Sequence, residues 1–405
     1  VKFQGHDVII DSDDIKENNL LKIQVILSYL SFIIFGLSDQ TIGVLIPVFV
    51  KDYEMKESTI SLLYFAQFFG YFIISVFNDY LHRLMGFHGV LVTSVGLIGT
   101  CSFIGMFKPP FFVLIIGYVL CGIGVGAQDA AVGVWLGKLK YSNELSGLLH
   151  ASYGVGCIVT PIFVTKVLLN NNISWRYHYL IIFMLAMVVS IIDFFVFKHE
   201  SKWKYRFQVE ENKSEENESE NDGNANESSG IRNAIKNKKV LGLALFLFLY
   251  VGTEVSIGAW TLSYLIKIKN GTMDQMSVVI SMFWFGLTLG RIVLGFVTPK
   301  LSSEYLANMI YESLSIVFFV LFCLGSSYWL FIATVFLTGV FIGPIFPTTT
   351  IYSVKILPVQ LHVSGVGFAM ALGGGGAAVL PWLMGNLCEL WGSFRLYPYF
   401  VVLFL

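Results

Sequence analysis

Long apolar runs separated by short polar turns dominate the pattern of this chain. Stretches of roughly 20 apolar residues recur from Leu21 to the end, and a helix of that length crosses the hydrocarbon core of a bilayer. The pattern predicts spans at 22–50, 58–78, 88–107, 110–137, 145–169 and 178–197, and a second set at 240–266, 276–298, 305–325, 328–352, 362–386 and from 396 onward. The sequence therefore predicts an all-α membrane protein with twelve helices.

One long polar segment interrupts this pattern between the two sets of spans. Residues 211–230 read ENKSEENESENDGNANESSG, which is nearly free of apolar side chains. Such a composition cannot bury a core and predicts disorder. We expect four parts along the chain: an N-terminal segment (1–21), a six-helix bundle (22–197), a disordered linker (198–239) and a second six-helix bundle (240–405).

The two sets of spans repeat the same small residues and acids in the same order. Three pairs of segments match: Gly147, Gly154, Gly156 and Pro161 with Gly367, Gly374, Gly376 and Pro381; Gly122 and Gly126 with Gly339 and Gly343; Asp39 and Gly43 with Glu254 and Gly258. Three ordered matches indicate a duplicated six-helix unit, so the bundles should be pseudo-symmetric. Parallel duplication of two bundles around a central site is typical of transporters.

Positive charge predicts the orientation of this bundle pair. The segment 198–239 holds nine lysines or arginines: Lys198, Lys202, Lys204, Arg206, Lys213, Arg232, Lys236, Lys238 and Lys239. The positive-inside rule places this segment, and with it both termini, in the cytosol. We expect a monomer in the plasma membrane or the vacuolar membrane. The chain begins at Val1 and ends about ten residues into its last apolar run, so we expect the last helix to be truncated.

Composition excludes several other classes of protein. The residues are 55% hydrophobic and 13% charged, and the net charge of −1 does not favour nucleic acid as a partner. The chain has no GxxxxGK[ST], HExxH or GxSxG motif, so we expect no enzyme, cofactor or metal. Without a CxxC pair, the five cysteines are expected to be buried thiols within the spans: Cys101, Cys121, Cys157, Cys323 and Cys388.

A few ionisable residues interrupt the apolar spans and are the candidates for function. A charge at that depth is costly unless it faces protein or water and finds a partner. Asp39, Asp129 and Glu254 are candidates for proton coupling, because a buried acid can load and release a proton. His150 lies at a depth similar to that of Asp129 and is a fourth candidate. The alternative is that each group is static and holds helices together.

A second group of ionisable residues points to gating or to the helix ends. Arg291 and Glu312 lie at similar depth on consecutive spans, which predicts a salt bridge that is either structural or breaks when the bundles rock. Asp79 and Asp193 lie near helix ends, where we expect solvated side chains.

Polar and aromatic side chains near these charges suit a hydroxylated ligand. Gln40, Gln67 and Gln128 can each donate and accept hydrogen bonds. Trp260 and Trp284, and with them Trp135, offer flat faces for a sugar ring. The alternative for the tryptophans is a place in the interfacial aromatic belt.

The whole pattern resembles the major facilitator superfamily. The similarity is most evident in GLTLGRIVLG (286–295), in SGLLHASYGVGCIVTP (146–161) and in YVGTEVSIGAW (250–260). Within the superfamily the chain looks similar to the fungal bypass-of-stop-codon group and is related to fucose–proton symporters and sodium-dependent glucose transporters. Acids in helices one and four are implicated in proton coupling in fucose–proton symporters, and Asp39 and Asp129 fall at those places.

The resemblance implies a secondary active transporter of a small polar solute, with a sugar and protons as expected partners in the bilayer. Residues 78–83 read NDYLHR and depart from the family pattern, because Asn78 replaces the usual glycine and His82 the usual acid. Two alternatives stay open. One is a uniporter or sodium-coupled carrier in the same fold, and the other is a transporter-like nutrient receptor that moves no solute.

Overall fold

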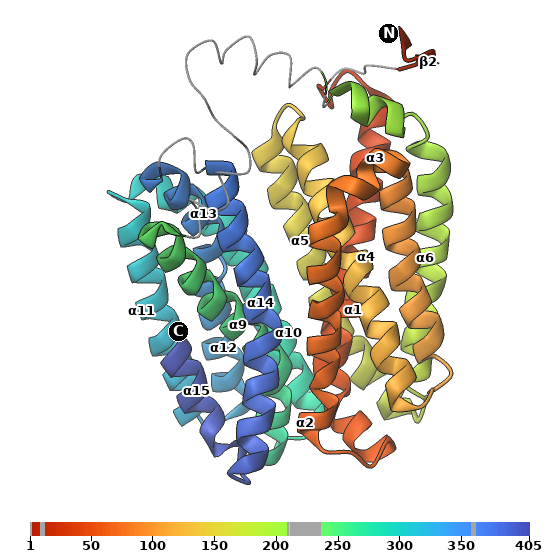
Figure 1. Cartoon of the computed structure of the whole chain (residues 1–405). Helices are drawn as coiled ribbons and strands as arrows, with labels where there is room; N and C mark the ends of the chain where they lie inside the picture. The colour runs from red at the N-terminus through yellow and green to blue at the C-terminus, as the bar shows by residue number, and fades with distance from the viewer. Residues whose placement is uncertain (1, 9–12, 209, 211–235, 358–361) are drawn as a thin grey trace.

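A computed structural model gives the fold of the chain (Figure 1) and describes residues 2–8, 13–208, 210, 236–357 and 362–405. The expected disorder of residues 211–230 lies outside these ranges. A short antiparallel hairpin of β1 (Lys2–Phe3) and β2 (His6–Asp7) precedes the helices. The rest of the described chain is a pair of helical bundles.

The described residues of the N-terminal half form five long helices and one short helix, α2. These are α1 (Asn19–Asp52), α2 (Glu57–Ile60), α3 (Leu62–Gly105), α4 (Phe111–Gly137), α5 (Ser142–Ile162) and α6 (Arg176–Val196). The π-helical turn η1 (Phe163–Leu168) and the 3-10 turn η2 (Leu169–Asn171) extend α5. Residues 202–208 form a further helical turn after α6.

The C-terminal half repeats this plan. Its helices are α9 (Lys238–Lys267), α10 (Met273–Val297), α11 (Glu304–Leu324), α12 (Tyr328–Ile342), α13 (Ile345–Ile356), α14 (His362–Leu390) and α15 (Tyr397–Phe404). The short 3-10 turns η4 (Thr298–Lys300) and η6 (Phe394–Leu396) lie between them.

The described residues contain 11 helical segments that are long and apolar enough to cross a membrane, and the shorter apolar helix Phe394–Phe404 stands at the twelfth position. This confirms the predicted membrane fold. Two details differ from the expected spans. The second and third spans form one helix, α3, that is broken at Gly86, where φ is 71°. The tenth span is divided into α12 and α13 at the Gly343–Pro344 pair, because proline interrupts the helical hydrogen bonds.

Equivalent caps begin the first helix of each half. The side chain of Asn18 accepts hydrogen bonds from the N–H groups of Leu20 and Leu21, and that of Asn237 accepts from Lys239 and Val240. Each cap satisfies backbone donors that would otherwise have no partner at a helix start. The duplication seen in the sequence therefore extends to how the helices begin.

Repeated glycines also make repeated contacts. A Cβ atom at Gly156 of α5 would lie 2.3 Å from the carbonyl oxygen of Ile33 in α1, and one at Gly376 of α14 would lie 1.9 Å from that of Phe248 in α9. Only glycine allows the backbones of these helix pairs to approach so closely. The matching spacing in the sequence thus reflects matching helix packing in the two halves.

The two halves lie side by side (Figure 1). We call the end where α6 ends and α9 begins the linker side and the opposite end, where α1 meets α2, the far side. The halves pack through α5 against α10, α3 against α14 and α1 against α9. Hydrogen bonds and ion pairs that join the described residues of the two halves all lie from the middle of the helices to the far side.

Candidate transport site between the two bundles

Asp39 lies where three helices of the N-terminal half meet. Its carboxylate, carried by α1, accepts a hydrogen bond of 2.8 Å from the amide nitrogen of Gln67 in α3. It accepts a second bond of 2.6 Å from the hydroxyl of Tyr153 in α5. Both donors are neutral, and no described residue forms an ion pair with Asp39. The acid is thus held in a fixed position without an opposite charge beside it.

Asp129 has a similar setting on α4. The hydroxyl of Tyr71 in α3 donates to its Oδ2 atom at 3.0 Å, and the same tyrosine ring faces Gly374 of α14 in the other half. His150 is exposed and contacts the ring of Phe32 edge-on at 6.4 Å. The described contacts therefore join Asp129 to Tyr71 and do not form a direct Asp129–His150 pair.

Glu254 differs from both of these acids because it is ion-paired. Its Oε1 atom lies 2.9 Å from Nη2 of Arg291, and its Oε2 atom lies 2.7 Å from the hydroxyl of Tyr250. Only 7% of Glu254 is exposed. The predicted salt bridge between Arg291 and Glu312 is therefore wrong, because α9 brings Glu254 to the arginine.

Glu312 lies on α11 and is half-buried. The structure describes no ion pair for its carboxylate, and a gating role for it stays a prediction. Depth along the chain placed Glu312 level with Arg291, but depth does not tell which face of a helix a side chain occupies. The face on which a side chain lies depends on how the helix is rotated about its axis, and packing against neighbouring helices sets that rotation.

The three glutamines serve different contacts. Gln67 is bound to Asp39. Gln40, next to Asp39 on α1, donates across the interface to the carbonyl of Gly258 in α9 at 3.3 Å. Gln128 is fully buried and donates to Ser31 at 3.1 Å, so it faces the interior of the N-terminal bundle.

The two tryptophans also differ. The indole N–H of Trp260 donates to the carbonyl of Pro381 at 2.9 Å inside the C-terminal half. Trp284 lies at the interface, with its ring edge-on to Tyr153 at 6.3 Å. Its indole nitrogen is buried and has no hydrogen-bond partner among the described residues. Trp284 therefore offers a free donor close to the tyrosine that binds Asp39.

Contacts between charged and polar side chains join the two halves on the far side. The sequence analysis did not predict these contacts. The carboxylate of Glu389 at the end of α14 binds both Lys56 and Ser58, and Glu57 of α2 binds Lys267 at the end of α9. Asp274 of α10 accepts from Asn170 at 2.7 Å. These residues lie in or beside short loops, where the sequence shows opposite charges but gives no partner across the halves.

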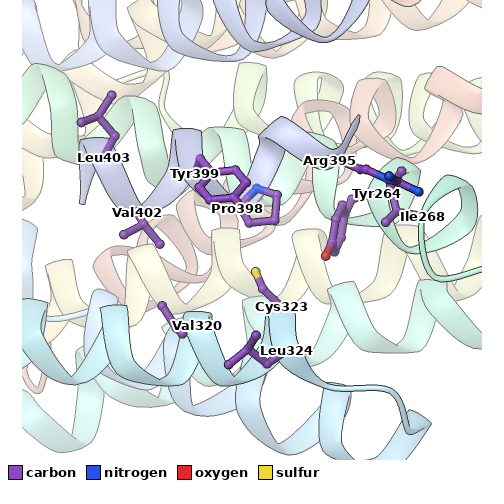
Figure 2. A pocket seen from close by; sticks show the side chains of 10 residues that line it. All are labelled: Tyr264, Ile268, Val320, Cys323, Leu324, Arg395, Pro398, Tyr399, Val402 and Leu403. Atoms are coloured by element: carbon purple, nitrogen blue, oxygen red, sulfur yellow. The ribbon is translucent and has the colours of Figure 1, made fainter. Parts of the chain in front are cut away.

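A cavity of about 870 Å³ lies away from these acids, within the C-terminal half (Figure 2). It is lined by side chains from the end of α9, the end of α11, η6 and α15, and Arg395 is its charged group. Several lining side chains, including Leu324, Tyr399 and Leu403, are more than 70% exposed. The cavity is therefore a recess open at the outer surface of this half, and it is separate from the carboxylate sites.

Two repeated helical bundles with polar and charged groups along the surface between them define a multi-pass membrane transport protein. The protein-family model described as Major Facilitator Superfamily matches residues 28–316 of the sequence. The chain belongs to this superfamily.

Individual relatives agree with this assignment. Bypass of stop codon protein 6 of Saccharomyces cerevisiae is 34% identical over 388 residues, which cover 91% of this chain and 78% of that protein. The glucose/mannose transporter GlcP of Bacillus subtilis is 24% identical over 370 residues, which cover 90% of this chain and 88% of GlcP. Among solved structures, the fucose:proton symporter FucP of E. coli shares the fold with a TM-score of 0.62 at 13% identity, covering 94% of this chain and 96% of FucP.

Proposed function

We propose that this protein is a secondary active transporter of a sugar or a similar small polar solute, and that it works by alternating access in symport with protons. The observation that carries the proposal is the setting of Asp39. Its carboxylate lies at the junction of α1, α3 and α5 and is bonded to neutral donors only. Its neighbour Gln40 contacts the other half of the molecule.

Neutral partners allow an acid to change its protonation state. When an ion-paired acid takes up a proton, the opposite charge is left buried and unpaired, which is costly. Asp39 and Asp129 avoid that cost, because tyrosine hydroxyls can also accept a hydrogen bond and glutamine carries both a donor and an acceptor. We therefore assign proton coupling to these two acids. The pairing of Glu254 with Arg291 favours a structural role for that acid.

The side chains near Asp39 support a hydroxylated substrate. Gln40, Gln67 and the unpartnered indole N–H of Trp284 are hydrogen-bonding groups at or beside the interface, and ring faces such as that of Trp284 are suited to the apolar side of a sugar. GlcP, which matches most of this chain, is named as a glucose/mannose transporter. Both points favour a monosaccharide.

The contacts between the halves indicate the state of the transport cycle. The basic residues of the linker favour a cytosolic linker side. Because Glu389, Lys56, Glu57 and Lys267 join the halves on the far side, we propose that this is a conformation closed to the outside. Alternating access would then require these contacts to break when the site faces outward.

Reconstitution tests the proposal. Purified protein in liposomes should accumulate glucose, mannose, fucose or xylose when an inward pH gradient is imposed. Asp129→Asn should abolish this uphill accumulation and spare the exchange of labelled sugar between the two sides. Asp7→Asn, which changes an exposed acid in the N-terminal hairpin, is the matched control and should behave like the unmodified protein.

Four results would contradict the proposal in different ways. Accumulation driven by a sodium gradient alone would identify a sodium-coupled carrier, and transport that ignores both gradients would identify a uniporter. Absence of any flux, with binding of the sugar retained, would favour a nutrient receptor. Uphill transport that survives Asp129→Asn would remove this residue from the mechanism.

A further inference from the structure

Asp193 is a buried acid that the proposed transport cycle does not use. It lies three residues before the end of α6, on the linker side, and 0% of it is exposed. Neither of its carboxylate oxygens has a hydrogen-bond partner. The expectation of a solvated side chain at this helix end is therefore wrong.

The position of Asp193 on α6 places it inside the N-terminal bundle. It continues the buried stripe formed by Tyr179, Ile182, Ala186 and Val189, whose spacing of three or four residues keeps one face of a helix. That stripe faces the bundle interior, because the hydroxyl of Tyr179 contacts the hydroxyl of Tyr118 in α4 at 2.7 Å. α6 lies at the outer side of the N-terminal bundle (Figure 1) and packs against α1 and α3, so its buried stripe faces these helices.

A chain of buried polar groups runs through the same interior. Gln24 of α1 donates to the carbonyl of Val196, one turn beyond Asp193, at 3.3 Å. Ser28 donates to the carbonyl of Gln24, and Ser31 donates to that of Ser28. Gln128 of α4 donates to the hydroxyl of Ser31. This chain connects the linker-side end of α6 with the residue next to Asp129.

Some buried acceptors in this interior have no donor. Gln128 uses one amide N–H bond, and its Oε1 atom is buried without a partner, as are both oxygens of Asp193. All three of these unpartnered oxygen atoms are hydrogen-bond acceptors. A proton bound to Asp193 would turn one of these acceptors into a donor.

The charged groups around α6 are directed elsewhere. On α3, Nε2 of His88 faces the carbonyl of Phe194 at 2.9 Å on the exposed surface. Beyond the end of α6, Glu200 is paired with Lys204 at 2.7 Å, and on α1 Lys22 contacts Asn19 at the surface. The structure describes no cation paired with Asp193. An ionised carboxylate in this place would be buried, unpaired and without hydrogen bonds, which is strongly unfavourable.

An aromatic cluster and a small polar cavity lie at the linker-side end of α6. The rings of Phe87, Trp135 and Phe197 pack together with centroid distances of 5.3–5.7 Å. Beyond them lies a cavity of about 30 Å³, which is lined by His82, Lys138 and Glu200 among others. A cavity of this size can hold a water molecule, and Phe87 and Trp135 are among its lining residues. The backbone N–H of Phe197 donates to the backbone carbonyl of Asp193 at 3.0 Å, so the aromatic cluster joins the polar pocket to the end of α6 that carries Asp193.

We propose that Asp193 is a second proton-binding site, which holds a proton as a neutral carboxylic acid and exchanges it with water at the linker side. In loading, a hydronium ion transfers its proton to a carboxylate oxygen, an O–H bond forms and water remains. In unloading, water takes the proton back. The site is distinct from Asp39 and Asp129, and its existence does not depend on the proposed transport function.

Infrared spectroscopy tests the proposal without a transport assay. The background is the full chain in liposomes with Asp39→Asn and Asp129→Asn, which removes the two other candidate acids. At neutral pH this protein should show a carbonyl stretching band of a protonated carboxyl group, with a downshift in D₂O. Adding Asp193→Asn should remove that band, whereas adding Asp7→Asn should leave it unchanged. An identical spectrum with and without Asp193→Asn would overturn the proposal.

Two further measurements keep the test decisive. If Asp193→Asn does not fold, ¹³C-labelled aspartate in the background protein should shift the same band, and absence of any shifted band would overturn the proposal. Trp135→Ala should speed deuterium uptake by this carboxyl group at least tenfold, and an unchanged rate would contradict the route through the aromatic cluster. Loss of the band on addition of sodium would identify a cation site in place of a proton site. Failure of sugar transport would leave all of these expectations intact.

Discussion

The acids in the two halves of this molecule occupy equivalent helices but have opposite surroundings. In the N-terminal half, Asp39 is bonded to Gln67 and Tyr153, which are neutral. In the C-terminal half, Glu254 occupies the corresponding place on α9 and is paired with Arg291 at 2.9 Å. The sequence repeat made the two acids look alike, and their partners make them different.

This difference indicates how a duplicated fold can divide its tasks. An acid with neutral partners can gain or lose a proton, and the rest of its site stays satisfied. An acid with a buried cation beside it is held in the charged state, because protonation would leave the cation without its partner. We infer that the N-terminal half carries the proton chemistry and that the C-terminal pair orients α9 and α10.

The largest expected effect comes from breaking the C-terminal pair. Arg291→Met should leave Glu254 as an unpaired buried charge and lower the free energy of unfolding by about 3–5 kcal/mol. The double variant with Glu254→Gln should be milder than the arginine variant alone. Thermal unfolding of the purified protein in detergent measures both effects.

The matched control for this experiment is Lys355→Met, which removes an exposed partner of Glu304 and should cost about 1 kcal/mol or less. Additive losses in the Glu254 and Arg291 variants would show that the two side chains do not interact. The contrast between the halves would then disappear.

A smaller loss of stability is expected on the N-terminal side of the comparison. Asp39→Asn keeps one carbonyl oxygen for Gln67 and alters the bond from Tyr153, so the free energy of unfolding should fall by only about 1–2 kcal/mol. Accumulation of sugar against its gradient should nevertheless be lost. Stability as low as that of Arg291→Met would indicate that Asp39 is a structural acid like Glu254.

The far-side contacts should shift a conformational equilibrium by a modest amount. Glu389→Gln weakens the contacts with Lys56 and Ser58 that join α14 to α2. An exposed ion pair of this kind is worth about 0.2–1 kcal/mol, so the population open on the far side should rise by a factor of about 1.4–5. Spin labels at Phe107 and Ser326 lie in far-side loops of opposite halves. Double electron–electron resonance between these labels should show an additional, longer distance in Glu389→Gln.

Glu304→Gln is the control for that measurement, because Glu304 pairs with Lys355 inside one half. It should leave the distance distribution unchanged. Equal distributions for Glu389→Gln and the unmodified protein would show that these ion pairs do not hold the halves together.

The smallest effect is expected at the surface, where Asp14 contacts Lys140. The hydrogen bond from Lys140 and that from the backbone N–H of Lys16 lower the pKa of Asp14 below its usual 3.8. An acid with a lowered pKa in the folded state stabilises it above the unfolded value, and this contribution is lost as the pH falls through the folded value. Asp14→Asn should therefore increase cleavage of the N-terminal segment at pH 7 slightly.

The same substitution should have no effect once the pH lies below both pKa values, because Asp14 is then neutral in either protein. Limited proteolysis at the two pH values with an acid-tolerant protease measures the difference. An effect of equal size at both values would assign the contact to packing rather than to charge.

Several properties of this protein follow from its sequence alone. The length of the apolar runs predicted the membrane spans, because a helix must satisfy its own backbone hydrogen bonds in lipid. The glycine spacing predicted the duplication, since Gly156 and Gly376 are needed for equivalent close contacts. The isolated acids at Asp39, Asp129 and Glu254 were conspicuous because charge is rare at that depth.

Only the tertiary structure decided which groups face one another. Depth along the chain placed Arg291 level with Glu312, but helix rotation brings it to Glu254. The position of Asp193 near a helix end suggested solvent, but the packing of α6 against α1 and α3 buries it. Sequence spacing fixes where a side chain lies along a helix axis, and the direction in which it points depends on packing between helices that are far apart in the chain.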